Sequence, residues 1–256
     1  MAAATARRIA FRPKTAIRWT AAAFGLIAIA IAAFGLATGF FDGNPIRLYG
    51  MKDSAGARVA AVYFSGDMGL RFGMGAHVAP ALAARNIPVF GINAPTVFKT
   101  RRSQAEVNAL VADAIRQAMA RSGARKVVLM GQSFGSDILV AGLGALPPGL
   151  RAKIEAVVLV VPGQTIYFRA DPTGFLYRGT PDADAVRDIR AMTWAPLICI
   201  YGRSETDSLC PALIGKAVKV IGLPGGHFLR NDHAKLVETI FAALAPILQH
   251  NLGETA

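Results

Sequence analysis

The sequence has no acidic residue before Asp42 and no charged residue of either sign from Trp19 to Phe41. The part of the chain before this segment carries several basic residues: Arg7, Arg8, Arg12, Lys14 and Arg18. An apolar segment of about 20 residues is long enough to cross a bilayer, and a basic flank stays on its cytoplasmic side. The pattern predicts a basic cytoplasmic tail over residues 1–18, a single transmembrane anchor over residues 19–41 and an external domain over residues 42–256.

A cleaved signal peptide is the alternative interpretation of this segment. The apolar run is longer than the hydrophobic region of a typical signal peptide, and it lacks a clear Ala-x-Ala cleavage site at its end. We therefore expect a single-pass protein of a bacterial inner membrane, with its folded domain in the periplasm.

Cysteine is scarce, since the chain has only Cys199 and Cys210. In an oxidising compartment, an even and closely spaced pair predicts a disulfide. The alternative is one buried thiol on a strand and one unrelated thiol in a loop.

Acidic residues are few, 16 against 28 lysines and arginines, which gives a formal net charge of +12. The basic residues are scattered, apart from the N-terminal tail and small pairs such as Arg101 and Arg102. A basic surface is attracted to an anionic bilayer. We therefore expect an anionic phospholipid as the partner and no nucleic acid, metal or cofactor; the oligomeric state stays open.

Short apolar segments that predict strands alternate with longer segments of helical periodicity. The expected strands are residues 46–49 at an edge, then 59–64, 88–93, 127–130, 156–161, 197–201 and 218–221. A helix is expected behind the capping box of Ser103 and Glu106, among others. The alternation predicts an α/β fold with a doubly wound, mostly parallel sheet. Residues 162–196 lack a clear periodic element, and we expect them to form a lid-like insertion.

The chain is organised around a Gly-x-Ser-x-Gly motif centred on Ser133. A buried strand precedes the motif and an apolar-periodic segment follows it, which is the context of a nucleophile elbow. The amide of Phe134 is then expected to bind an oxyanion together with an amide of the glycine-rich loop at Asp67 and Met68. The alternative is a tight strand–helix turn with an incidental serine.

A nucleophilic serine needs a base that a third group orients, and in this fold the chain order is serine, acid, histidine. Glu205 and Asp207 follow the strand at 197–201, and His227 follows the last strand in a glycine-rich loop. Of the four histidines, only His227 occupies a strand-end loop in the required order. Either Glu205 or Asp207 can be the acid.

Four segments together resemble the AcvB/VirJ family of bacterial virulence-associated α/β-hydrolases: residues 63–67, 131–137, 199–211 and 223–227. The resemblance runs from about Val59 to Leu244, and the loop with the paired cysteines is its most specific element. Members of this family are periplasmic hydrolases of aminoacyl-phosphatidylglycerol. The resemblance therefore implies a serine hydrolase whose triad is Ser133, His227 and either Asp207 or Glu205.

The expected reaction is cleavage of the lysyl or alanyl ester of aminoacyl-phosphatidylglycerol at the periplasmic face of the membrane. A carboxylate such as Asp137 or Asp67 is expected to bind the ammonium group, and the insertion aromatics Tyr167 and Phe168 to contact the substrate. Two alternatives are a general periplasmic esterase or lipase, and a non-catalytic interaction protein associated with secretion.

Overall fold

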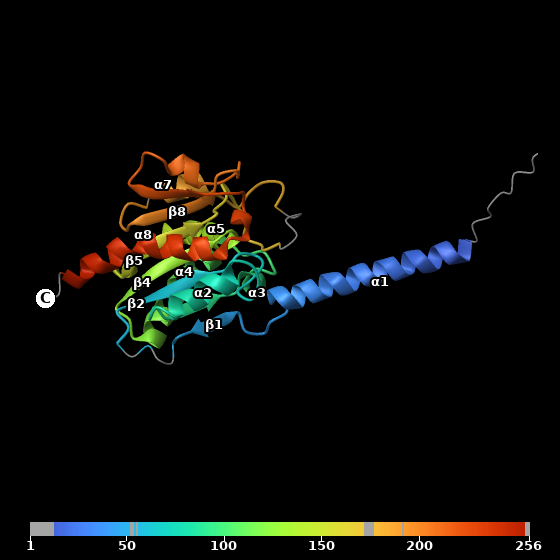
Figure 1. The fold of residues 1–256 in the computed structure, drawn as a ribbon, viewed down its shortest axis with the longest axis horizontal. Coiled ribbons are helices and arrows are strands. Elements are labelled where there is room, and N and C mark those ends of the chain that lie inside the picture. The colour runs from blue at the N-terminus through green and yellow to red at the C-terminus, as the bar shows by residue number, and fades with distance from the viewer. Residues whose placement is uncertain (1–12, 52–53, 55, 172–176, 191, 254–256) are drawn as a thin grey trace, which may run out of the picture.

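A seven-stranded sheet forms the centre of the protein in a computed structural model that describes residues 13–51, 54, 56–171, 177–190 and 192–253 (Figure 1). The strand order is β1-β3-β2-β4-β5-β8-β9. These strands are β1 (Ile46–Tyr49), β2 (Val59–Phe64), β3 (Val89–Ile92), β4 (Lys126–Gln132), β5 (Ile154–Val160), β8 (Leu197–Gly202) and β9 (Val218–Leu223). All neighbouring pairs are parallel except the edge strand β1, which is antiparallel to β3. The predicted fold class is confirmed.

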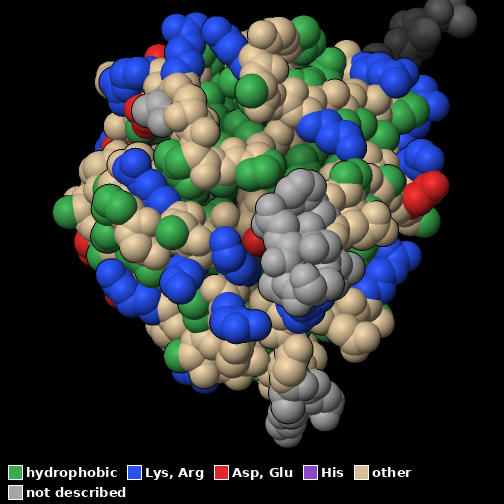
Figure 2. Space-filling view, turned by 90° about the vertical axis from the view of Figure 1, so that its left-hand side faces the viewer, with side chains coloured by type: hydrophobic (Ala, Val, Ile, Leu, Met, Phe, Trp, Pro, Cys, Tyr) green, Lys and Arg blue, Asp and Glu red, His purple; other side chains and the backbone are tan. Residues whose placement is uncertain are grey.

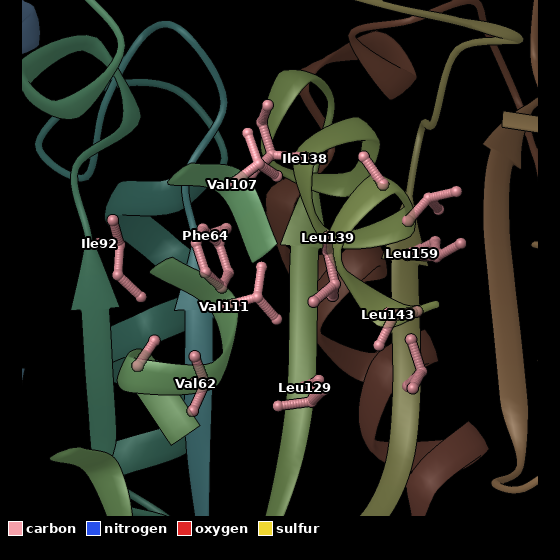
Figure 3. Close-up of a cluster of buried hydrophobic side chains, with 14 of the residues drawn as sticks. Val62, Phe64, Ile92, Val107, Val111, Leu129, Ile138, Leu139, Leu143 and Leu159 are labelled. Atoms are coloured by element: carbon pink, nitrogen blue, oxygen red, sulfur yellow. The ribbon is translucent and has the colours of Figure 1, made fainter. Parts of the chain in front are cut away.

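Helices cover both faces of the sheet. They are α2 (Gly75–Ala83), α3 (Ala94–Val97), α4 (Gln104–Ser122), α5 (Phe134–Leu143), α6 (Pro148–Arg151), α7 (Ala185–Arg190) and α8 (His233–Gly253), with two short 3₁₀ turns, η1 (Cys210–Leu213) and η2 (Leu229–Asn231). Because successive side chains of a strand point to opposite faces, Phe64 packs with α4 and α5, whereas its neighbour Tyr63 packs with α2 and α8. Figure 3 shows the first of these two cores, where Val111 and Leu139 face the side chains of β2 and β4.

The start and end of α4 follow from the local sequence. The Ser103 hydroxyl accepts a hydrogen bond from the amide of Glu106, whose carboxylate in turn accepts one from the Ser103 amide. Gly123 ends the helix in a left-handed conformation with φ of 72°, which glycine adopts without a steric penalty. The predicted capping box is confirmed.

The insertion at residues 162–196 contains more regular structure than the sequence pattern indicated. β6 (Thr165–Ile166) pairs with β7 (Ala183–Asp184) in an antiparallel ribbon, and α7 follows directly. Two of its side chains, Ile166 and Ile189, are buried in the core that α4 and α5 share. The ribbon is too short to show a periodicity of two, which explains why the sequence predicted no element here. Residues 172–176 and 191 of the insertion lie outside the described part of the chain.

Helix α1 (Pro13–Thr38) projects from the body as a single long rod (Figure 1). Its segment Trp19–Thr38 is long and apolar enough to cross a membrane, and its most apolar 18-residue window is not buried inside the protein. The helix ends at Thr38, before the predicted limit of Phe41, because Gly39 turns the chain with φ of 75°.

Cys199 and Cys210 form a disulfide with a Cα separation of 5.5 Å, as the sequence predicted. Cys199 lies on β8 and Cys210 begins η1, so the bond ties the intervening loop to the sheet. Lysines and arginines are scattered over the face of the body that lies opposite α1, rather than gathered in one patch (Figure 2).

Candidate active site

Ser133 lies at the sharp turn between β4 and α5, with φ of 50° and ψ of −126°. The glycines on both sides of it are required by close packing. A Cβ atom on Gly131 would lie 2.5 Å from the Cα of Ser136, and one on Gly135 would lie 2.3 Å from the carbonyl oxygen of Phe64. Larger residues cannot occupy either position without moving the backbone, so the motif holds the serine in a strained conformation at the start of a helix.

A continuous chain of hydrogen bonds joins Ser133 to a histidine and a carboxylate. Ser133 Oγ lies 2.7 Å from His227 Nε2, and His227 Nδ1 lies 2.5 Å from Glu205 Oε1. A carboxylate accepts from the Nδ1–H group, which leaves Nε2 unprotonated and directed at the serine hydroxyl. This is the geometry of a serine nucleophile with its general base.

Glu205, and not Asp207, is the carboxylate that the structure brings to His227. The Glu205 amide donates to the carbonyl of Gly202 at 2.9 Å in a tight turn directly after β8. This turn directs the Glu205 side chain inward, where only 5% of it is exposed. Asp207 is exposed at the edge of the pocket, and its backbone carbonyl accepts a hydrogen bond from the amide of Gln164 at 3.1 Å.

The electrostatic surroundings of His227 favour its protonated form. Burial by itself lowers the pKa of His227, whereas the hydrogen bond and the negative charge of Glu205 raise it. Two further carboxylates, Asp137 and Asp67, add to the increase, so that the pKa of His227 lies above its usual value. An imidazolium ion that forms during a reaction is therefore stabilised.

The glycine-rich loop after β2 lies beside the serine, as the sequence predicted. Asp67 and Met68 line the same pocket as Ser133 and Phe134. A Cβ atom on Gly66 would lie 3.4 Å from the Cβ of Ser133, so the loop backbone lies against the nucleophile. The backbone amides expected to bind an oxyanion thus belong to two segments that both lie beside Ser133.

Tyr177 of the insertion is a site residue that the sequence analysis did not identify. Its hydroxyl donates to Asp67 Oδ2 at 2.8 Å and accepts from the amide of Asp171 at 2.9 Å. Its ring stacks against Phe134 and Tyr167, with centroid distances of 6.2 and 5.6 Å. The aromatic residues of the insertion were a signal, but nothing in their spacing showed that Tyr177 contacts Asp67.

Asp137 lies one helical turn after Ser133, where it is partly buried and lines the pocket. The amide of Gly163 donates to its Oδ1 at 2.9 Å. Burial raises the pKa of Asp137 to about 7. Burial also raises the pKa of Asp67, against the opposing hydrogen bond from Tyr177. Two carboxyl groups with raised pKa values therefore lie near the nucleophile.

The two insertion aromatics that the sequence predicted as substrate contacts have different positions. Tyr167 lines the pocket. Phe168 does not, because its side chain is 3% exposed and lies in the core beside α4 and α5. Neighbouring residues in an extended segment point in opposite directions, so one of the pair faces the pocket and the other faces the core. The expectation for Phe168 was wrong.

The pocket has a volume of about 650 Å³, within the range of small-molecule sites. Its lining combines the triad and the partly buried carboxylates with apolar side chains that include Met68, Phe72 and Phe228. Among the described residues, no group of three or more histidine, cysteine, aspartate or glutamate side chains could hold a metal ion.

The residues of this site fall within one recognised sequence family. A family model described as bacterial virulence protein (VirJ) matches residues 58–247, which include Ser133, Glu205 and His227. The chain belongs to the VirJ family. The resemblance noted from the sequence motifs is thereby confirmed. No curated protein shows significant sequence similarity to the chain.

Solved structures that resemble this VirJ-family chain are esterases and related hydrolases. Est1E from Butyrivibrio proteoclasticus has a TM-score of 0.60 at 12% identity, covering 80% of this chain and 94% of Est1E. A thermophilic esterase from Thermogutta terrifontis has a TM-score of 0.54 at 18% identity, covering 79% and 88% of the two chains. The thioesterase domain from the curacin biosynthetic pathway has a TM-score of 0.55 at 15% identity, covering 77% and 94%. At these identities the likeness establishes the α/β-hydrolase fold.

Proposed function

We propose that this VirJ-family chain is a serine hydrolase that cleaves a carboxylic ester through an acyl-enzyme. The observation that carries the proposal is the hydrogen-bonded series Ser133–His227–Glu205 at the edge of a 650 Å³ pocket. The fold supports it, because several similar structures are described as esterases.

In this mechanism Ser133 Oγ attacks the ester carbonyl while His227 Nε2 takes its proton. Glu205 holds the imidazole in the required tautomer and stabilises the imidazolium. The amide of Phe134, with an amide of the Asp67–Met68 loop, stabilises the negative charge on the carbonyl oxygen. His227 then delivers the proton to the departing alcohol, and a water molecule releases the acyl group by the same steps in reverse order.

The favoured substrate is aminoacyl-phosphatidylglycerol, in which an amino acid is esterified to the lipid headgroup. This substrate carries at least one ammonium group close to its reacting carbonyl. Asp67 and Asp137 are partly buried carboxyl groups that line the same pocket as Ser133. A bound cation favours the ionised form of a carboxyl group, so an ammonium group would lower the raised pKa of Asp137 and form an ion pair with it.

The location that fits this substrate is a bacterial inner membrane, with α1 as a single-pass anchor and the catalytic domain in the periplasm. An apolar segment of suitable length in α1 and the basic residues before it support this orientation. The disulfide supports an oxidising compartment. The anionic lipid that remains after hydrolysis is the expected partner of the basic protein surface.

The proposal is tested with full-length protein in lipid nanodiscs that contain lysyl-phosphatidylglycerol. Mass spectrometry should detect free lysine and intact phosphatidylglycerol. Ser133→Ala should abolish the reaction, with a loss of turnover on the order of a millionfold. Ser204→Ala, at an exposed serine directly before Glu205, should retain the parent rate.

Two other outcomes contradict the favoured substrate. Release of fatty acid instead of lysine would identify a lipase or general esterase with the same triad. If neither lysyl-phosphatidylglycerol nor a simple soluble ester is cleaved, the chain is a non-catalytic interaction protein.

A further inference from the structure

The C-terminal end of α1 joins the folded body directly, without an intervening linker. Thr38, the last residue of the helix, and the following Gly39 are both buried. The side-chain amide of Asn93 donates to the carbonyls of Thr38 and Gly39, each at 3.3 Å, and the hydroxyl of Thr96 donates to Gly39 O at 2.6 Å. Carbonyls at a helix end otherwise lack partners. Asn93, which follows β3, therefore caps α1 and joins it to the sheet.

The same asparagine joins α1 to the loop that lines the pocket. Asn93 Oδ1 accepts a hydrogen bond from the amide of Leu70 at 2.9 Å. A Cβ atom on Gly69 would lie 2.2 Å from the carbonyl oxygen of Thr38, so the loop backbone packs directly against the end of the helix. The loop that carries Asp67 and Met68 therefore has a defined position relative to α1.

A cluster of charges holds the segment after α1 in place. The carboxylate of Asp42 pairs with Arg47 of β1 and with Arg71 of the pocket loop. Surface ion pairs contribute little singly, but here they bind both sides of the junction that Asn93 forms. The junction therefore resists bending between helix and body.

The length of the apolar segment sets the level of the pocket relative to a bilayer. Trp19–Thr38 comprises 20 residues, and at 1.5 Å per residue it spans about 30 Å, the thickness of the hydrocarbon core. Phe34 lies four positions before Thr38, which is about 6 Å along the axis. Its ring packs edge-on against that of Phe72, with centroids 6.5 Å apart. Phe72 therefore packs beside the last turns of α1, close to the boundary between the hydrocarbon core and the headgroups.

Phe72 and Phe228 form an exposed aromatic rim on the pocket. They are 47% and 57% exposed, and both line the pocket. Phe228 directly follows His227, and its ring contacts the imidazole edge-on at 5.7 Å. Large exposed apolar side chains that surround a pocket mark an interaction surface, and aromatic rings are favoured at the level of lipid headgroups.

We propose that the rim of Phe72 and Phe228 rests in the headgroup region of the bilayer that α1 crosses, so that the pocket opens onto the lipid surface. The inference rests on the proposed function in taking α1 as a membrane span and a phospholipid as the substrate. In Figure 1 α1 leaves the body where the loops after β2 and β3 meet it, which is the end of the sheet that carries the pocket. The substrate ester then reaches Ser133 without leaving the membrane surface.

Lipid-borne quenchers test this placement in full-length protein. Both native cysteines are in the disulfide, so single cysteines introduced by Phe72→Cys and Phe228→Cys take an environment-sensitive fluorophore selectively. The matched control is Ile214→Cys. Ile214 is 64% exposed and precedes the start of β9, at the opposite end of the sheet. The labelled proteins are reconstituted in vesicles of phosphatidylethanolamine and phosphatidylglycerol that carry a nitroxide near the glycerol backbone.

Fluorophores at positions 72 and 228 should be quenched roughly threefold more strongly than at position 214, because only the rim reaches the headgroup region. Equal quenching at all three positions would overturn the proposal, as would a chain that does not float with the vesicles. Should Phe72→Cys fail to fold, the measurement at position 228 decides alone.

A flexible insertion tests the role of the junction. About eight Gly and Ser residues between Thr38 and Gly39 add roughly 15 Å of reach, and quenching at positions 72 and 228 should fall to the level of position 214. Undiminished quenching would show that the Asn93 junction does not set the placement.

Lysine release is measured in the unlabelled parent protein, in vesicles of the same composition to which lysyl-phosphatidylglycerol is added, and this separates the inference from the proposed reaction. Lysine release without quenching at the rim overturns the lipid-surface contact and leaves the hydrolase. Quenching at the rim in a protein that cleaves no ester supports the contact and overturns the hydrolase.

Discussion

The hydroxyl of Tyr177 donates a 2.8 Å hydrogen bond to the carboxylate of Asp67, which lies 110 positions earlier in the chain. This bond joins the insertion to the loop beside the nucleophile. Because the ring of Tyr177 also stacks on Phe134, one side chain contacts both segments that are expected to bind the oxyanion.

Removing this hydroxyl should therefore impair catalysis. Tyr177→Phe leaves Asp67 with one hydrogen bond fewer, and an unsatisfied buried acceptor costs about 1–3 kcal/mol. Because the Tyr177 bond lowers the pKa of Asp67, that pKa should rise further in the variant. We expect kcat/KM for an aminoacyl ester to fall by about 10–100-fold, since 1.4 kcal/mol corresponds to tenfold.

Tyr167→Phe is the matched control, because the hydroxyl of Tyr167 donates only to the carbonyl of Gly179, at 3.3 Å. Equal effects of the two substitutions would show that the Asp67 contact has no special role.

The two acids of the loop after β8 should differ sharply. Glu205→Gln should reduce turnover by about 10⁴-fold, as loss of a triad acid can, whereas Asp207→Asn should stay within a few-fold of the parent. Because Glu205 raises the pKa of His227, the acidic limb of the kcat/KM profile should lie above pH 6.5 in the parent. The residual activity of Glu205→Gln should show that limb at lower pH. A larger loss in Asp207→Asn would transfer the role to Asp207.

Asp137 should make the protein less stable as the pH rises toward neutrality. Its pKa is 3.8 in the reference state and about 7 in the folded protein. Between these values the folded state binds more protons than the unfolded state, so the free energy of unfolding falls as the pH increases. Asp137→Asn keeps an acceptor for the Gly163 amide and never ionises. Above about pH 7 it should be more stable than the parent by up to about 4 kcal/mol.

Urea unfolding at acidic and at mildly alkaline pH measures this difference. Asp207→Asn provides the control, because it removes an exposed carboxylate from the edge of the same pocket. Parallel stability curves for Asp137→Asn and the parent would show that Asp137 is ionised in the folded protein at all these pH values.

Loss of the disulfide should affect activity more than stability. The bond between Cys199 and Cys210 closes the loop that carries Glu205, and closing a loop of this size is worth roughly 3 kcal/mol in the chain-entropy model. The double variant, with serine at both positions, should unfold at a lower temperature. It should also lose activity well below its Tm, because the distance from Glu205 to His227 depends on that loop. Retention of full activity until global unfolding would contradict this dependence.

Local features of this protein could be predicted from the sequence because neighbouring residues determine them. The elbow at Ser133 needs glycine at positions 131 and 135 for steric reasons, and a serine three residues before a glutamate is a local signature of a helix N-terminus. Alternating apolar strands and periodic helices predict a parallel sheet with few alternatives. Such a sheet brings the loops after β4, β8 and β9 together at the carboxyl ends of the parallel strands. The serine and the histidine could therefore be identified from the sequence.

Contacts between distant segments were decided only by the tertiary structure. Glu205 and Asp207 are both acids of the loop after β8, and the turn at Gly202 selects which of them faces His227. Phe168 differs from Tyr167 only in the side of the chain that it occupies, which depends on how β6 packs on the core. The contacts of Tyr177 with Asp67 and of Asn93 with the end of α1 each join residues more than fifty positions apart. Sequence periodicity reports burial along a single element, whereas these contacts depend on how several elements pack together.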